Sequence, residues 1–180
     1  MGSARASASM SVGSGSFNDG DIMGLAHFCE HMLFLGSKTF SKPSEFETYL
    51  DNYFGITNAF TEPEKTTFYF ELGANGFEKA LVMFSRMFAE PLFDMEFMNK
   101  EIEAVNSEHN KNLNQDNWKE NELIKSLSNP KHPYNKFHTG NNQTFRQVSL
   151  EALNAKLKEY YQKYYIPTNM KLVVMSKSNI

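Results

Sequence analysis

Residues 24–36 read GLAHFCEHMLFLG, an almost wholly apolar run that carries two histidines and a glutamate at its centre. A segment that is apolar nearly all round is typical of a buried helix, and Gly36 is suited to end it. The fold must therefore bury this helix and also provide partners for the polar side chains of His27, Glu30 and His31. Burying three such groups without partners would cost roughly several kcal/mol.

The spacing of these three residues indicates a metal site. His27 and His31 are four residues apart, so they lie about 40° from each other around a helix and can face one point. Glu30 is offset from both and is placed to act as a general base on a water. The order H-x-x-E-H is the inverse of the H-E-x-x-H motif of zinc peptidases. The alternative is a hydrogen-bonded polar cluster without a metal.

A catalytic zinc needs a third protein ligand, and residues 94–112 supply a candidate. This segment predicts a helix whose apolar ridge, Met98, Ile102 and Val105, continues to Glu108. Glu101 lies seven residues earlier on the same side, where it could support a ligand histidine. Each glutamate could instead be a solvated residue on a helix edge.

The remaining pattern predicts an α+β fold with an antiparallel-rich sheet and helices packed on one face. Ser44, with Glu47 three residues on, predicts a capping box for the second helix. Residues 170–175 read as a buried strand, and 129–142 as a loop. Residues 6–12 could also be a Ser/Gly linker. The expected strands are 6–12, 56–61, 66–72 and 170–175, and the expected helices are 24–35, 44–54, 77–88, 94–112, 118–127 and 149–164.

Composition narrows the function classes. The 180 residues, 41% of them hydrophobic, suit one globular domain, and the net charge of -3 disfavours nucleic-acid binding. There is no apolar run long enough to predict a membrane span. The single cysteine, Cys29, fits a reducing compartment and favours the cytoplasm, although many exported proteins also lack disulfides. Residues 1–5 read as a cloning remnant or a disordered end.

Four segments together resemble the insulinase/pitrilysin family of inverzincin metallopeptidases: HFCEHMLFLG, NAFT at 58–61, SEHNKN at 107–112 and NPKHPYNKF at 129–137. The resemblance implies a zinc metalloendopeptidase that hydrolyses small or unfolded peptides. It implies that Zn²⁺ is bound by His27, His31 and Glu108, which follows His31 by 77 residues as in the family. Glu101 would support the site from behind, and Glu30 would be the general base.

The resemblance also implies roles around the cleft. Asn58 would hold the backbone of the peptide substrate, and Phe34 and Phe60 would line the pocket beside the scissile bond. Ordinary core packing is the alternative for both phenylalanines. Cys29 would make activity sensitive to thiol reagents, or would be a small buried hydrophobic residue.

Members of this family are several times longer, so residues 6–180 are expected to be part of the zinc-bearing domain of a larger peptidase. Its missing C-terminal domains would be partners, and the isolated chain would be inactive and prone to self-association. Two alternatives remain open. One is a non-catalytic homologue that acts as a scaffold or assembly subunit, and the other is a mitochondrial-type processing peptidase.

Overall fold

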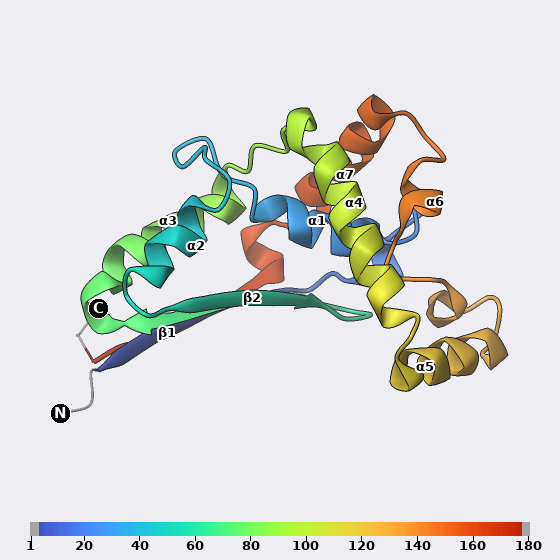
Figure 1. Cartoon of the computed structure of the whole chain (residues 1–180), viewed down its shortest axis with the longest axis horizontal. Coiled ribbons are helices and arrows are strands. Elements are labelled where there is room, and N and C mark those ends of the chain that lie inside the picture. Colours follow the sequence, from blue (N-terminus) through green and yellow to red (C-terminus); the bar gives the residue numbers. More distant parts are fainter. Residues whose placement is uncertain (1–3, 178–180) are drawn as a thin grey trace.

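The computed structural model of this chain describes residues 4–177 and contains one four-stranded sheet, which lies along one side of the molecule (Figure 1). The strands are β1 (Arg5–Val12), β2 (Ile56–Thr61), β3 (Thr66–Gly73) and β4 (Met170–Met175). Their order is β2-β3-β1-β4, and every neighbouring pair is antiparallel. The two edges of the described sheet are therefore β2 and β4.

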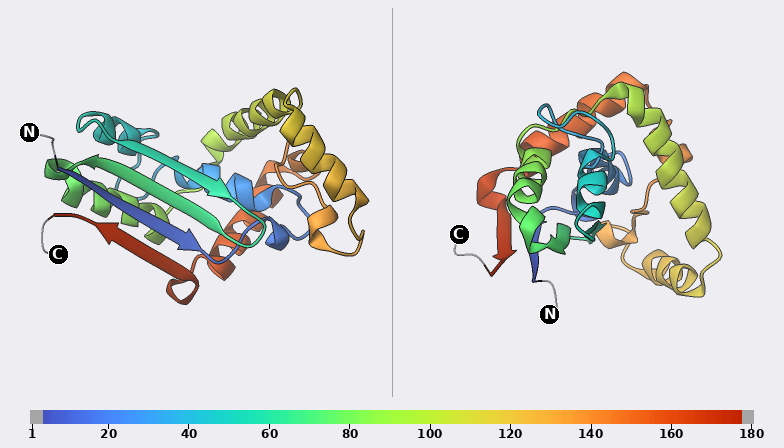
Figure 2. Two further views of the ribbon diagram at one scale, coloured as in Figure 1. Left: turned by 90° about the horizontal axis from the view of Figure 1, so that it is seen from below. Right: turned by 60° about the vertical axis from the view of Figure 1, so that its left-hand side comes forward.

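The helices other than α5 (Asp116–Leu127) gather on one face of this sheet, α5 lies beyond one end of it, and the opposite face carries no helix in the view from below (Figures 1 and 2). The predicted α+β class, with a sheet covered on one face, is confirmed. The helices are α1 (Leu25–Leu33), α2 (Glu45–Asp51), α3 (Phe77–Ala89), α4 (Met95–Asn112), α5 (Asp116–Leu127), α6 (Asn142–Phe145) and α7 (Leu150–Tyr164). Short 3-10 turns lie at Ser16–Asn18, Ala74–Gly76, Pro133–Asn135 and Pro167–Asn169.

Strand alternation explains which sheet face is covered. Phe68, Phe70 and Leu72 of β3 are fully buried beneath the helices, as are Ala6 and Ala8 of β1. The intervening serines of β1 point to the opposite face. Residues 6–12 are thus a strand, and the linker alternative is wrong.

The N-terminal boundary differs slightly from the expectation. Strand β1 already begins at Arg5, whose guanidinium pairs with Glu71 at 2.9 Å. Arg5 therefore belongs to the sheet and not to a disordered end. The rest of the prediction for residues 1–5 falls mainly on residues 1–3, which lie outside the described range.

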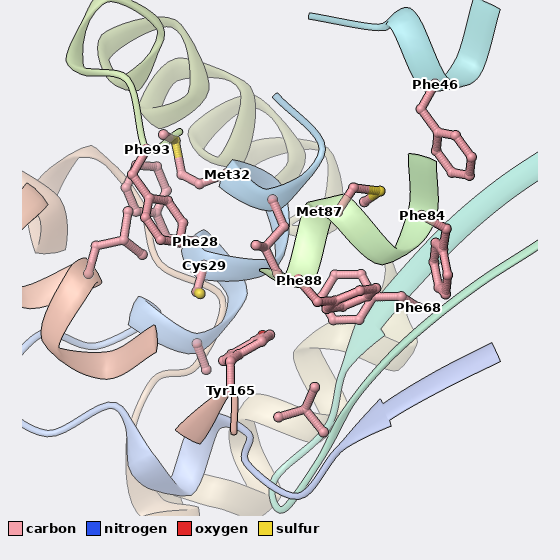
Figure 3. Packing of buried hydrophobic residues seen from close by; sticks show 14 of the residues in the cluster. Phe28, Cys29, Met32, Phe46, Phe68, Phe84, Met87, Phe88, Phe93 and Tyr165 are labelled. Carbon is pink, nitrogen blue, oxygen red and sulfur yellow. The ribbon is translucent and has the colours of Figure 1, made fainter. Parts of the chain in front are cut away.

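Helix α1 lies at the centre of the hydrophobic core. Phe28, Cys29, Met32 and Leu33 are all fully buried. They pack among phenylalanines and methionines from the sheet, α3 and the segment before α4 (Figure 3). Because the core encloses α1, the polar side chains of this helix are held in fixed positions.

Three local expectations are corrected. β4 is not a buried strand: it pairs only with β1 among the described residues, and Leu172, Val173 and Met175 are at least half exposed. Ser44 precedes α2 but has φ 60°, and its side chain makes no capping bond to the helix backbone, so the capping box is absent. The 129–142 loop contains one 3-10 turn, and α6 begins at its last residue.

Between residues 4 and 177, the structure contains no helix with the length and apolar character needed to cross a bilayer.

Candidate metal centre and cleft

The first turn of α1 is fixed by a buried carboxylate. Asp19 accepts hydrogen bonds from the N–H groups of Gly24 and Ala26, each at 2.8 Å. Gly24 has φ 89°, a left-handed conformation that glycine adopts without strain. Burial raises the pKa of Asp19 to about 7. Asp19 therefore sets where α1 begins and, with it, the direction of the histidine next to Ala26.

His27, His31 and Glu108 converge on one point. The Nε2 atoms of the two histidines are 3.2 Å apart, and Glu108 Oε2 lies 3.6 Å from His27 Nε2 and 3.4 Å from His31 Nε2. Donor atoms that bind one tetrahedral Zn²⁺ at about 2.0–2.1 Å are separated by about 3.3 Å. The three separations thus fit the spacing of tetrahedral zinc ligands.

The outer nitrogen of each imidazole has its own partner. His27 Nδ1 donates to the Thr139 carbonyl at 2.7 Å, and His31 Nδ1 lies 2.6 Å from Glu101 Oε1. A carbonyl can only accept, so His27 carries its proton on Nδ1 and directs the Nε2 lone pair at the shared point. This arrangement, with a carbonyl or carboxylate behind each histidine, is the usual environment of metal-binding imidazoles.

Without a metal, the two histidines of this cluster differ in protonation. Burial, together with the neighbouring His31, lowers the pKa of His27. Burial also acts to lower the pKa of His31, but hydrogen bonds to Glu101 and Glu108 outweigh it and raise that pKa to about 9. The hydrogen bond to His31 lowers the pKa of Glu108. In the metal-free protein a proton on His31 thus occupies the position where a cation would bind.

Glu30 lies on α1 between the two histidines and does not join the three-atom group. Its Oε2 accepts a hydrogen bond from the Thr61 hydroxyl of β2 at 2.6 Å. Burial raises the pKa of Glu30 to about 7, even though the Thr61 bond acts in the opposite direction. A carboxylate with a pKa near neutrality can both accept and return a proton at physiological pH.

Apart from Asp19 and the backbone N–H groups that it binds, these groups line one open cleft with a volume of about 750 Å³. Strand β2 forms one side, and Trp118, Lys125, Tyr134 and His138 lie on the side formed by α5 and the following loop. The lining also includes Asn58, Phe34 and Phe60, the three residues expected to contact substrate. The structure therefore brings together every residue expected at the site except Cys29.

The two phenylalanines lie in different surroundings. Phe34 is partly buried and packs against the core residue Phe68, with ring centres 5.9 Å apart. Phe60 is 44% exposed and contacts Tyr69. Phe34 thus contributes to the core as well as to the cleft. Phe60 is mainly a surface residue of the cleft.

Cys29 does not face the cleft. Its side chain is fully buried among apolar residues near Tyr165 (Figure 3), and burial raises the pKa of its thiol. A protonated thiol without solvent access reacts slowly with thiol reagents. The geometry favours the small buried hydrophobic residue over the reactive site.

Sequence reasoning missed several groups that complete the site. Thr61 acts through its hydroxyl and Thr139 through its backbone carbonyl. Asp19 acts through its hydrogen bonds to the first turn of α1, several residues further along the chain. None of these has a spacing rule that could reveal it. Aspartate in the turn-rich segment before α1 was the only available signal, because aspartate favours the start of a helix.

Comparisons with known proteins agree with this geometry. Residues 2–131 match the family described as Insulinase (Peptidase family M16). Human insulin-degrading enzyme is 39% identical over 98% of this chain. A Schizosaccharomyces pombe relative, whose name includes the words "zinc protease", is 42% identical over 96% of it. The chain spans 18% of the length of each of these two relatives.

Among solved structures, the crystal structure of pitrilysin superposes with a TM-score of 0.92 and 30% identity. The superposition covers 98% of this chain and 19% of the pitrilysin chain. The family model thus covers residues 2–131, and the relatives and the pitrilysin structure cover nearly the whole chain. The chain belongs to the insulinase family of peptidases, family M16.

Proposed function

We propose that this chain is the zinc-bearing part of a longer endopeptidase that cleaves small or unfolded peptides. The observation that carries the proposal is the convergence of three donor atoms, spaced 3.2–3.6 Å apart, beside a buried carboxylate in an open cleft. His27, His31 and Glu108 would hold the ion. Bound Zn²⁺ would supply Lewis-acid polarisation and lower the pKa of a water.

Glu30 would move the proton in this reaction. It would accept a proton from the attacking water and later deliver it to the leaving amine of the cleaved peptide. Thr61 would keep the carboxylate aimed into the cleft through its 2.6 Å hydrogen bond. Glu101 and the Thr139 carbonyl would keep the two imidazoles in the orientation that exposes Nε2.

Strand β2 would hold the substrate. It is an edge strand of the described sheet, and the Ala59 N–H donates to its neighbour Asn58 Oδ1 at 2.8 Å. An extended peptide could pair with the edge by β-strand addition once the Asn58 amide moves aside. Phe34 and Phe60 would bound the adjoining pocket.

The isolated chain would have little or no activity. The cleft is open, and the Glu108 side chain at its metal site is 43% exposed, so water would compete with substrate groups. The C-terminal domains that the family resemblance implies would close the cleft and act as partners. Without them the exposed apolar residues would favour self-association.

Glu30→Gln in the full-length protein tests the proposal. Glutamine keeps the size of the side chain but cannot accept the proton, so turnover should fall by about 10²–10⁴-fold or more. Zinc content, measured by elemental analysis, should be unchanged, because Glu30 lies outside the ligand group. Glu120→Gln, on the exposed surface of α5, is the control and should retain activity.

Two results would contradict these roles. Loss of zinc in Glu30→Gln would make Glu30 a ligand. Unchanged turnover would show that another group carries the proton, and absence of turnover in the unaltered full-length protein would favour the scaffold alternative.

A further inference from the structure

The backbone of Thr139 and Gly140 lies directly against the start of helix α1. The Thr139 carbonyl accepts the hydrogen bond from His27 Nδ1 at 2.7 Å. Gly140 is so close to Gly24, the residue before α1, that a Cβ atom added at Gly24 would lie 2.5 Å from Gly140 N. This separation is well inside van der Waals contact. Backbone therefore packs on backbone beside the hydrogen bond that holds His27.

The other side of Gly140 is closed by Phe145 of α6. A Cβ atom added at Gly140 would lie 2.8 Å from Phe145 Cε2. The Phe145 ring is 1% exposed and packs against Phe28 of α1, with ring centres 4.9 Å apart. Because neighbouring core side chains hold this ring, it has no free space to move into. Gly140 is thus confined between Gly24 and a core phenylalanine.

The residues that follow Gly140 are attached to α4, the helix that carries Glu108. The Asn142 N–H donates to Asn106 Oδ1 at 3.0 Å, and Arg146 pairs with Glu103 at 2.7 Å. Both partners are on α4, and Asn106 lies two residues before Glu108. The segment from Thr139 to α6 therefore connects the two helices that carry the three proposed ligands.

We propose that Gly24 and Gly140 are positioning residues of the metal site. Their contact holds the Thr139 carbonyl against the His27 ring, and this hydrogen bond keeps Nε2 aimed at the point shared with the other two ligands. The inference rests on the proposed zinc site, because it explains how one ligand of that site is oriented. A side chain at Gly24 would push the carbonyl away from the ring.

Two substitutions displace the carbonyl without altering a proposed ligand, and each has a matched control. Gly24→Ala places a methyl group against Gly140. Its control is Gly20→Ala, where φ is also positive, at 67°, but nothing lies within 4 Å of the added Cβ atom. Phe145→Leu removes the ring that supports Gly140 from the other side. Its control is Phe84→Leu, the same change at a ring that is also 1% exposed but packs against the sheet.

Zinc affinity, measured by competition with a chelator, should fall by about 10–100-fold in Gly24→Ala and Phe145→Leu. This is the usual effect of losing the partner behind a metal-binding histidine. Both controls should bind zinc as the unaltered chain does.

A second measurement needs no metal. In the metal-free chain the hydrogen-bonded Nδ1–H of His27 should give a slowly exchanging proton NMR signal, assigned by its absence from His27→Asn. Exchange of this proton with solvent should be at least about tenfold faster in Gly24→Ala and Phe145→Leu and unchanged in the two controls. A loss of stability without displacement of the carbonyl would not separate the variants from their controls.

Several results would overturn the inference. These are an unchanged N–H signal in the two variants, equal losses in the controls, faster exchange with unchanged zinc affinity, or absence of the signal from the unaltered chain. If Gly24→Ala does not fold, the comparison of Phe145→Leu with Phe84→Leu decides. If the unaltered chain binds no zinc, the proposed function fails for this chain, and the N–H signal alone decides whether the two glycines position His27.

Discussion

Helix α1 buries seven of its nine residues, whereas α5 buries none of its twelve, although both helices border the same cleft. The two proposed ligand histidines are on α1, and the third ligand is on α4, whose apolar ridge is also buried. The α5 side contributes Trp118 and Lys125 from a helix that projects from the body (Figure 2). The proposed ligands, which require accurate placement, therefore lie on core helices. The α5 side, which carries none of them, is weakly packed.

The largest expected effect concerns stability. Phe28 of α1 is fully buried against Phe145, so Phe28→Ala should lower the free energy of unfolding by about 3–5 kcal/mol. Leu127 of α5 is 79% exposed, so Leu127→Ala should change it by less than about 0.5 kcal/mol. Urea unfolding of both variants measures this. Similar losses would show that α5 is as firmly packed as α1.

Zinc affinity provides the second contrast. Glu108 and Glu122 have equally exposed side chains, 43% each, but Glu108 faces the two histidines and Glu122 pairs with Lys125. Glu108→Ala should weaken zinc binding by at least about 100-fold, since it removes a ligand. Glu122→Ala should leave the affinity unchanged. Competition with a fluorescent chelator gives both values, and equal affinities would exclude Glu108 as a ligand.

The smallest step is the change in zinc affinity over one pH unit. In the metal-free protein the pKa of His31 is raised to about 9, so zinc must displace a proton from it below that pH. Zinc affinity should therefore rise about tenfold per pH unit between roughly 6.5 and 9. A pH-independent affinity would show that His31 is not the protonated group.

The stability of the metal-free protein should change in the opposite direction. Because the pKa of His31 is raised above the ordinary histidine value of 6.5, it stabilises the fold fully below pH 6.5, and this contribution is lost as pH rises through 9. Imidazole NMR gives a comparison across the cleft: His138, with a pKa of about 4, should not titrate in this range. Titration of His138 near neutrality would show that the α5 side is more open to water than in this structure.

Much of the fold was predictable because the patterns were local. Strand alternation in 66–72 and the ridge of Met98, Ile102 and Val105 each determine one element and the face it buries. The positions of His27, His31 and Glu108 followed from helical spacing and from the family resemblance. The roles of Asn58, Phe34 and Phe60 stay predictions, since placement in the cleft does not show contact with a substrate.

The errors arose where tertiary context decides. MKLVVM reads as a buried strand, but its place at the sheet edge leaves Val173 67% exposed. Ser44 matches a capping box, yet the chain enters α2 with φ 60°, which turns the serine hydroxyl away from the helix N–H groups. Glu47 accordingly lines the cleft, a position that the capping pattern does not predict.

The hydrogen bond from His27 to the Thr139 carbonyl joins residues 112 positions apart. During synthesis, the histidines would leave the ribosome long before Glu108 and longer still before Thr139. Until then, a nascent chain could offer zinc only two loosely oriented imidazoles. Metal loading would thus be a late step in biogenesis, and ribosome-bound chains that end before residue 139 should retain zinc poorly compared with longer ones.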